Sequence, residues 1–262
     1  RYVGKTLLGY YTLAYSTIQL PLTKISAAVT SVMFPAFSRY QDDDAALRAD
    51  YTQMVCYLLY ITGSILMFIS FFAPEIITTI FSDKWLDSVR LIRILIVVGL
   101  LKSIGTTVGT IINAKGKTNI SFFWNLFVLA VVAPAFYVGA KIVPQYIDIN
   151  GAEAVAWTYS IVYTFLFFGI QYIANSLIGL SMWEYARGIL PALKVLSLLT
   201  VLLFAQRLGL DATGVTLPAP VVFVGGAVLN VGILAALLRW LDPGFLNTIM
   251  RKSHARNLRS AA

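Results

Sequence analysis

The chain has 262 residues, of which 58% are hydrophobic and only 12% are charged. Soluble domains carry roughly 25% charged residues, so this composition, with a mean hydropathy of +0.78, excludes an ordinary soluble protein and predicts an integral membrane protein. The net charge of +8 would suit a nucleic-acid partner, but the cations follow the loops between apolar segments, so we expect no nucleic-acid binding.

Seven apolar segments reach the roughly 20 residues that a helix needs to cross a bilayer. They lack the ~10-residue alternating pattern of a membrane β-barrel, so the predicted fold class is all-α, a polytopic membrane helix bundle. The transmembrane domain is expected over 1–250 and a basic cytoplasmic tail over 251–262. The predicted spans are about 7–38, 51–80, 94–113, 118–140, 154–180, 189–206 and 217–240.

Cations are unevenly shared between the two sets of alternate loops, with ten in one set and seven in the other. The positive-inside rule makes the richer set cytoplasmic, which places the C-terminus inside and the N-terminus outside. The chain opens on Arg1 and shows no signal peptide, so we interpret it as the C-terminal part of a larger transporter-sized protein. The richer set is Arg39, Arg48, Lys115, Lys117, Arg187, Arg239, Arg251, Lys252, Arg256 and Arg259, and the poorer is Arg1, Lys5, Lys84, Arg90, Arg93, Lys141 and Arg207.

Three lysines, Lys24, Lys102 and Lys194, interrupt the apolar segments. A charge at bilayer depth costs at least ~2.5–3.5 kcal/mol, so it usually faces a polar cavity or a partner. Lys194 is near the predicted cytoplasmic end of its span and is expected to snorkel to the interface. Lys24 shares a helical face with small and polar residues, which predicts cavity lining, although close helix packing also favours such residues. That face comprises Ala14, Thr17, Pro21, Ala28, Ser31 and Pro35.

Lys102 lies on a similar face of the third span. Two interpretations remain open: it is a cation in the transport lumen, or it pairs with an acid such as Glu75 or one in an absent half of the protein. The residues that share its face are Gly99, Thr106, Gly109 and Asn113.

Two weaker sets of polar residues are candidates for sugar contact. Gln171 and Asn175 lie at i and i+4, a spacing that suits hydroxyl recognition but also interhelical hydrogen bonding. Tyr10 and Tyr15 are placed to stack on sugar rings near the outer mouth, or to anchor the helix at the interface.

The sequence gives little support for a catalytic site, a metal site or a cofactor site. His254 is the only histidine and lies in the polar tail, which excludes histidine-based triads and metal sites. The acidic run at Asp42–Asp44 is better interpreted as a solvated helix N-terminus than as a metal site. The turn after Asn113 lacks the spacing of a phosphate-binding loop. We therefore predict no enzyme activity, no metal and no cofactor.

Three segments carry a resemblance to a known family. They are LGYYTLAYSTIQLPLTKISAAVTSVMFPAFSRYQDD near the start, FSDKW, and IINAKGKTN. In order and spacing they resemble the polysaccharide-flippase (Wzx-type) branch of the multidrug/oligosaccharidyl-lipid/polysaccharide transporter superfamily, over about residues 1–125. The resemblance implies two six-helix lobes around a central cavity, often with two extra helices, of which this chain would hold the eighth to fourteenth.

The resemblance also implies a function. Such proteins flip undecaprenyl-pyrophosphate-linked oligosaccharide across the bacterial inner membrane for lipopolysaccharide O-antigen, capsule or exopolysaccharide assembly. Lys24 and Lys102 would then hold the pyrophosphate, because lysine supplies charge without demanding bidentate geometry. The implied partners are this lipid-linked glycan, the bilayer, the absent N-terminal lobe and polysaccharide polymerase machinery. The alternatives are a cation-coupled multidrug exporter of the same superfamily, a membrane-integral polymerase or glycosyltransferase, and a structural role.

Overall fold

The computed structural model describes residues 4–39, 42–212 and 217–242, and these ranges contain helices but no strand. Seven helical segments within them are long and apolar enough to cross a bilayer, which confirms the predicted all-α membrane bundle. The spans are α1 (Lys5–Arg39), α2 with its continuation α3 (Asp44–Phe71), α5 (Ser88–Ala114), α6 with its continuation (Thr118–Gln145), α7 (Gly151–Leu177), α8 (Met182–Ala212) and α9 (Ala219–Leu241).

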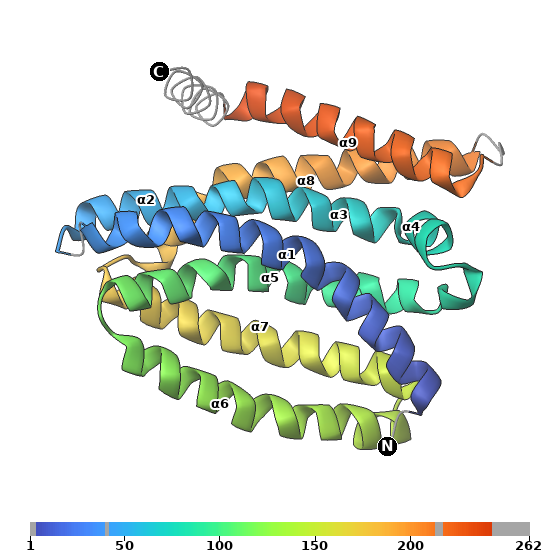
Figure 1. Ribbon diagram of the computed structural model, residues 1–262, viewed down its shortest axis with the longest axis horizontal. Coiled ribbons are helices and arrows are strands. Elements are labelled where there is room, and N and C mark those ends of the chain that lie inside the picture. The colour runs from blue at the N-terminus through green and yellow to red at the C-terminus, as the bar shows by residue number, and fades with distance from the viewer. Residues whose placement is uncertain (1–3, 40–41, 213–216, 243–262) are drawn as a thin grey trace, which may run out of the picture.

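Helix α5 occupies the centre of the bundle. It packs most extensively against α1 and α7, while α6 covers α7 and the α2–α3 helix adjoins α5 from the other side. Helices α8 and α9 lie beyond α2 and α3, so that Figure 1 shows the bundle extending from α6 at one edge to α9 at the other, with α1 crossing in front of α5. Successive spans alternate in direction, so α1, α5 and α7 begin at the same end.

Several helices begin earlier than predicted. The second, third and sixth spans begin at Asp44, Ser88 and Met182, instead of 51, 94 and 189. Charged residues in these first turns end an apolar segment, but they do not end a helix, because helices can extend beyond the hydrocarbon into water. The predicted basic tail, 251–262, lies outside the described residues.

The second predicted span is not one continuous α-helix. It contains a π-helical turn, η1 (Leu59–Gly63), between α2 (Asp44–Leu58) and α3 (Ser64–Phe71). A separate short helix, α4 (Ala73–Ile80), follows, with Pro74 in its first turn, where a proline needs no N–H partner. The remaining short elements are η2 (Asp83–Trp85), η3 (Val138–Ile142) and η4 (Val143–Gln145).

Close packing brings α8 against α2 and η1. A Cβ added to Gly63 would lie 2.8 Å from Leu196 Cδ1, and one added to Gly188 would overlap the Thr52 side chain. Small residues permit this approach because membrane helices associate by direct van der Waals packing.

Polar contacts tie the loops together at the end of the bundle where α2 begins. The Asp43 side chain accepts hydrogen bonds from the backbone N–H groups of Ala45 and Ala46, so it caps α2 as the helix N-terminus interpretation of this acidic run predicted. Lys115 Nζ lies 2.6 Å from Asp44 Oδ1, and Arg48 donates to the Gly179 carbonyl at 2.9 Å.

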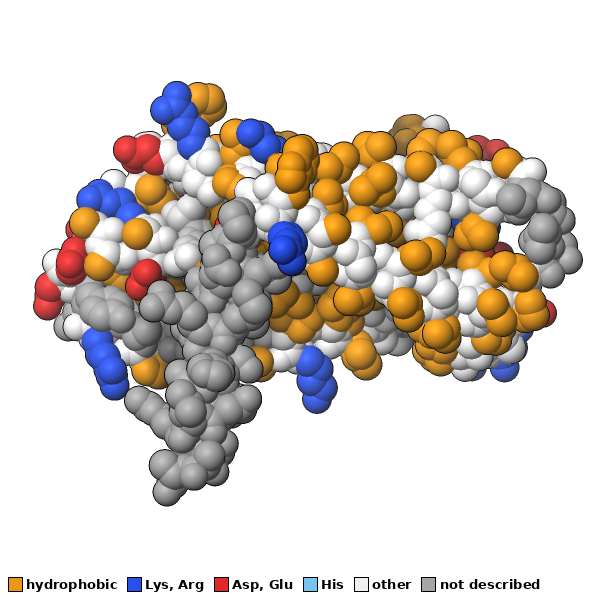
Figure 2. All heavy atoms as spheres, turned by 90° about the horizontal axis from the view of Figure 1, so that it is seen from above, with side chains coloured by type: hydrophobic (Ala, Val, Ile, Leu, Met, Phe, Trp, Pro, Cys, Tyr) orange, Lys and Arg blue, Asp and Glu red, His pale blue; other side chains and the backbone are white. Residues whose placement is uncertain are grey.

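The outer surface is largely apolar. Figure 2 shows one face of the molecule, whose central and right-hand parts are dominated by hydrophobic side chains. Helices α6 and α9 contribute many of the exposed apolar residues, as a lipid-facing surface requires. They include Phe122, Phe123, Phe127, Leu129, Val224, Val228 and Val231.

Candidate functional site

Lys102 lies near the middle of α5 and is half-buried among tyrosines. Its Nζ donates a hydrogen bond to the Tyr15 hydroxyl on α1. The same nitrogen lies 4.9, 5.6 and 5.8 Å from the ring centroids of Tyr15, Tyr163 and Tyr159, respectively. Aromatic faces attract a cation at these distances, so three rings from two helices hold the ammonium group in place.

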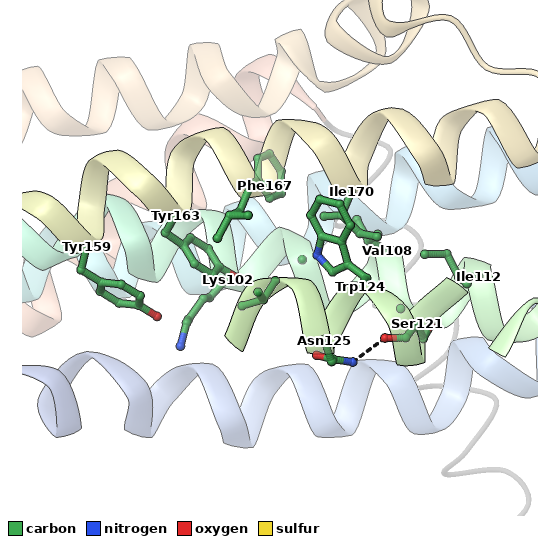
Figure 3. Close-up of a pocket in the computed structure, with 14 residues that line it drawn as sticks. Lys102, Val108, Ile112, Ser121, Trp124, Asn125, Tyr159, Tyr163, Phe167 and Ile170 are labelled. Carbon is green, nitrogen blue, oxygen red and sulfur yellow. Dashed lines mark hydrogen bonds between the residues drawn. The ribbon is translucent and has the colours of Figure 1, made fainter. Parts of the chain in front are cut away.

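A cavity of about 320 Å³ adjoins Lys102 between α5, α6 and α7. Gly105 and Gly109 form its α5 wall, where the absence of side chains leaves space. Figure 3 shows Lys102, Tyr159 and Tyr163 toward one end of this cavity. Its α6 wall is formed by Ser121, Trp124, Asn125 and Val128.

A second cavity, of about 280 Å³, shares Lys102, Gly105 and Tyr163 with the first but opens toward α1. Ser26 is buried at this wall, and its hydroxyl has no hydrogen-bond partner among the described residues. Lys102 therefore stands where two polar cavities meet. The α1 side of the second cavity is formed by Gln19, Leu22, Thr23 and Ser26.

Lys102 has no carboxylate partner within the described ranges. Glu75, the acid considered for this role, instead pairs with Arg207 of α8. A cation inside a membrane protein needs compensation, and hydroxyl and ring contacts neutralise none of its charge. The site is therefore chemically suited to bind an anionic group.

The other two lysines lie elsewhere. Lys24 is exposed on α1, immediately after the cavity residue Thr23 but outside the lining of both cavities, so the structure does not bring it together with Lys102 in one pocket. On the face predicted for Lys24, Ala14 is fully buried while Ala28 and Ser31 are exposed, so only the second half of that face is uncovered. Lys194 is exposed on α8.

Gln171 and Asn175 lie in a buried network rather than beside a cavity. Gln171 Nε2 donates to the Tyr51 hydroxyl and to Asn175 Oδ1, both at 2.8 Å. Asn175 Nδ2 in turn lies 3.3 Å from Met182 Sδ. These contacts join α7 to α2 and to the start of α8, which is the interhelical hydrogen bonding that the i, i+4 spacing also allowed.

The two candidate tyrosines have different surroundings. Tyr15 contacts Lys102, whereas Tyr10 packs edge-on against Trp85 with ring centroids 5.8 Å apart. Sequence reasoning missed Tyr159 and Tyr163 on α7 and Ser121 and Asn125 on α6. Ser121 and Asn125 lie at i and i+4, so the same spacing rule that selected Gln171 could have found this polar pair.

Comparison with known proteins shows which proteins this chain is similar to. Residues 1–90 match the family model described as a polysaccharide biosynthesis protein. The teichuronic acid biosynthesis protein TuaB of Bacillus subtilis (strain 168) is 25% identical over 80% of this chain and 42% of its own length. The lipopolysaccharide biosynthesis protein WzxC of Escherichia coli (strain K12) is 31% identical over 54% of this chain and 29% of its own.

Over part of its length, the chain is therefore similar to bacterial polysaccharide biosynthesis proteins. The amylovoran biosynthesis protein AmsL of Erwinia amylovora agrees, at 26% identity over 71% of this chain and 46% of its own length. This chain thus spans less than half the length of these relatives. No solved structure matches the chain.

Proposed function

We propose that this chain forms the C-terminal half of a flippase that moves undecaprenyl-pyrophosphate-linked oligosaccharide across the bacterial inner membrane by alternating access. The observation that carries the proposal is Lys102, a cation without a carboxylate partner among the described residues, standing where two cavities meet. A pyrophosphate entering from either cavity would supply the missing negative charge.

The surroundings of Lys102 suit a glycan attached to that pyrophosphate. Tyr159, Tyr163 and Trp124 offer ring faces, and Ser121 and Asn125 offer polar groups in the same cavity. Aromatic faces with a few placed polar groups are the general composition of a small-molecule site. Gln171 and Asn175 receive no sugar contact in this proposal, because they belong to the buried network and line neither cavity beside Lys102.

Lys24 has a separate role in the proposal. It is exposed on α1 beside the second cavity, so it would face the half of the protein that this chain does not contain. In a transporter built from two lobes, the substrate site lies between them and rocking of the lobes exposes it alternately to each side. Lys24 would then meet the pyrophosphate from the lobe interface. The charge asymmetry of the loops supports a cytoplasmic C-terminus.

The rival drug-exporter function is less consistent with this site. Cationic drugs need an acidic lumen, whereas the charged residue at the junction of the two cavities, Lys102, is positive. Glu75, the acid that the sequence offered as a partner for Lys102, is paired with Arg207 instead.

The test is surface polysaccharide in cells that depend on the complete parent protein. Lys102→Gln and Lys24→Gln should each lower it at least ~10-fold, since a charged hydrogen bond contributes ~1.5–3 kcal/mol. Lys194→Gln is the matched control, because Lys194 is exposed on α8 and lines neither cavity. Wild-type polysaccharide in both cavity-side variants, at equal protein levels, would refute the proposal.

A further inference from the structure

A second feature lies on an exposed side of α5 and α7, and its lining does not include Lys102. It is a groove of about 310 Å³. Two hydroxyls border it, but both are occupied: Ser160 donates to the Ile94 carbonyl at 3.2 Å and Thr164 donates to the Ser160 carbonyl at 2.7 Å. The rest of its lining below Arg93 is apolar, namely Ile94, Val97, Trp157, Ile161 and Phe165.

Arg93 closes one end of the groove. The same arginine also lines a neighbouring polar cavity of about 510 Å³, so it stands between an apolar compartment and a polar one. Its Nε donates to the Ser70 carbonyl of α3 at 3.3 Å, which orients the guanidinium. Its other guanidinium nitrogens have no hydrogen-bond partner among the described residues, and they remain available to an anion.

Two acids line the polar cavity, Asp87 and Glu153, and Glu153 is already engaged. Glu153 is almost fully buried, with Oε2 3.2 Å from Arg90 Nε and Oε1 accepting from Asn150 Nδ2 at 2.7 Å. Arg93 is absent from the ion pairs of the described residues. The charge of Arg93 is therefore not paired with a carboxylate among the described residues.

The positions of Arg93 and Trp157 along their helices fit the depth of a bilayer interface. Arg93 and Trp157 lie five and six residues after the first residues of α5 and α7, which begin at the same end of the bundle. At ~1.5 Å per residue, both lie roughly 7–9 Å into their helices, where tryptophan favours the interface and arginine can reach it. From Trp157 the groove continues to Phe165, roughly 12 Å deeper.

We propose that this groove binds an anionic phospholipid of the bilayer. An acyl chain would lie against Val97, Ile161 and Phe165, and the phosphate would accept hydrogen bonds from Arg93. The headgroup would occupy the polar cavity beside Asn150. A bilayer phospholipid suits the groove because Ile161 and Phe165 are 55% and 76% exposed, so the groove opens onto the exposed apolar surface of α7. This site uses none of the Lys102 cavity and does not depend on the proposed transport.

The test measures lipid binding to the complete parent protein by native mass spectrometry. Phosphatidylglycerol should bind at least ~10-fold more tightly than phosphatidylcholine, and Arg93→Gln should abolish that preference. Arg93→Lys keeps the charge and should retain part of it, which separates binding from folding. Ile161→Trp should weaken the binding of both lipids by filling the groove. Lys84→Gln, at an exposed cation of the same end, should change nothing.

Four outcomes would overturn this inference. The preference for phosphatidylglycerol could persist in Arg93→Gln, which would show that Arg93 does not bind the phosphate. Lys84→Gln could reduce the preference as much as Arg93→Gln does, which would indicate that general surface charge causes it. Soluble glycerol phosphate could compete as well as the lipid, which would show that the groove contributes nothing. Retention of undecaprenyl pyrophosphate alone, without phosphatidylglycerol, would likewise assign the groove to a different lipid.

Discussion

At the scale of single residues, the structure separates two kinds of buried polar group. Lys102 is held by hydroxyl and ring contacts that leave its charge available, and it stands beside open space. Gln171 is fully buried with its amide nitrogen used twice, and it borders none of the described cavities. The surroundings of Lys102 therefore suit binding of an anion, whereas those of Gln171 suit hydrogen bonding between helices.

Gly109 offers a sharp test of the cavity. A Cβ added there meets nothing within 4 Å, so Gly109→Leu should place its side chain in the cavity without disturbing the fold. We expect transport by the complete parent protein to fall roughly 10-fold, because overpacking an occupied site costs ~1–3 kcal/mol. Thermal stability should be unchanged or slightly higher, since leucine favours a helix more than glycine does.

Gly225→Leu on α9 is the matched control for this substitution. Its added Cβ also meets nothing within 4 Å, but Gly225 lines none of the described cavities. Equal transport loss in both variants would mean that added bulk, and not cavity filling, causes the defect.

At the scale of helices, an ion pair joins the α8–α9 hairpin to the rest of the bundle. Arg207 of α8 pairs with Glu75 of α4, and it also lies 3.4 Å from Asp211 on its own helix. The Glu75 side chain is 13% exposed, whereas Asp211 is 60% exposed. The two carboxylates should therefore differ in their contribution to stability.

Arg207→Leu should lower the free energy of unfolding by about 2 kcal/mol, because it leaves Glu75 without a partner in a largely buried place. Asp211→Asn should cost less than about 0.5 kcal/mol, as exposed pairs one helical turn apart contribute little. The double variant Glu75→Leu/Arg207→Leu should recover most of the loss. Thermal unfolding in detergent measures all three, and equal effects of the two single substitutions would contradict this account.

Hydropathy predicted the spanning helices well, since a run of some 20 apolar residues has few other stable structures in a membrane. It could not predict where α2, α5 and α8 begin, because Arg48, Arg90 and Glu184 end an apolar segment without ending a helix.

The candidate site was predictable only in part. Lys102 was recognisable because a mid-span charge is costly and rare. Tyr159, Tyr163 and Trp124 were not, because aromatic residues that line a cavity have the same composition as those that face lipid. Only the packing of α6 and α7 against α5 distinguishes them.

At the scale of the whole molecule, the chain spans 29–46% of the length of the relatives compared, and α1 is largely uncovered although it borders a cavity. A largely exposed span that carries Lys24 and several hydroxyls is costly against lipid, so we expect it to face the other half of the parent protein.

In the proposed function, the cation Lys102 binds the pyrophosphate of a lipid-linked glycan as the glycan crosses the membrane. The most direct test of this claim is transbilayer movement of a fluorescent undecaprenyl-pyrophosphate oligosaccharide in proteoliposomes that contain the complete parent protein. Wild type and Lys194→Gln should move the lipid, and Lys102→Gln should move it at least ~10-fold more slowly. Movement at the wild-type rate by folded Lys102→Gln protein would contradict the claim.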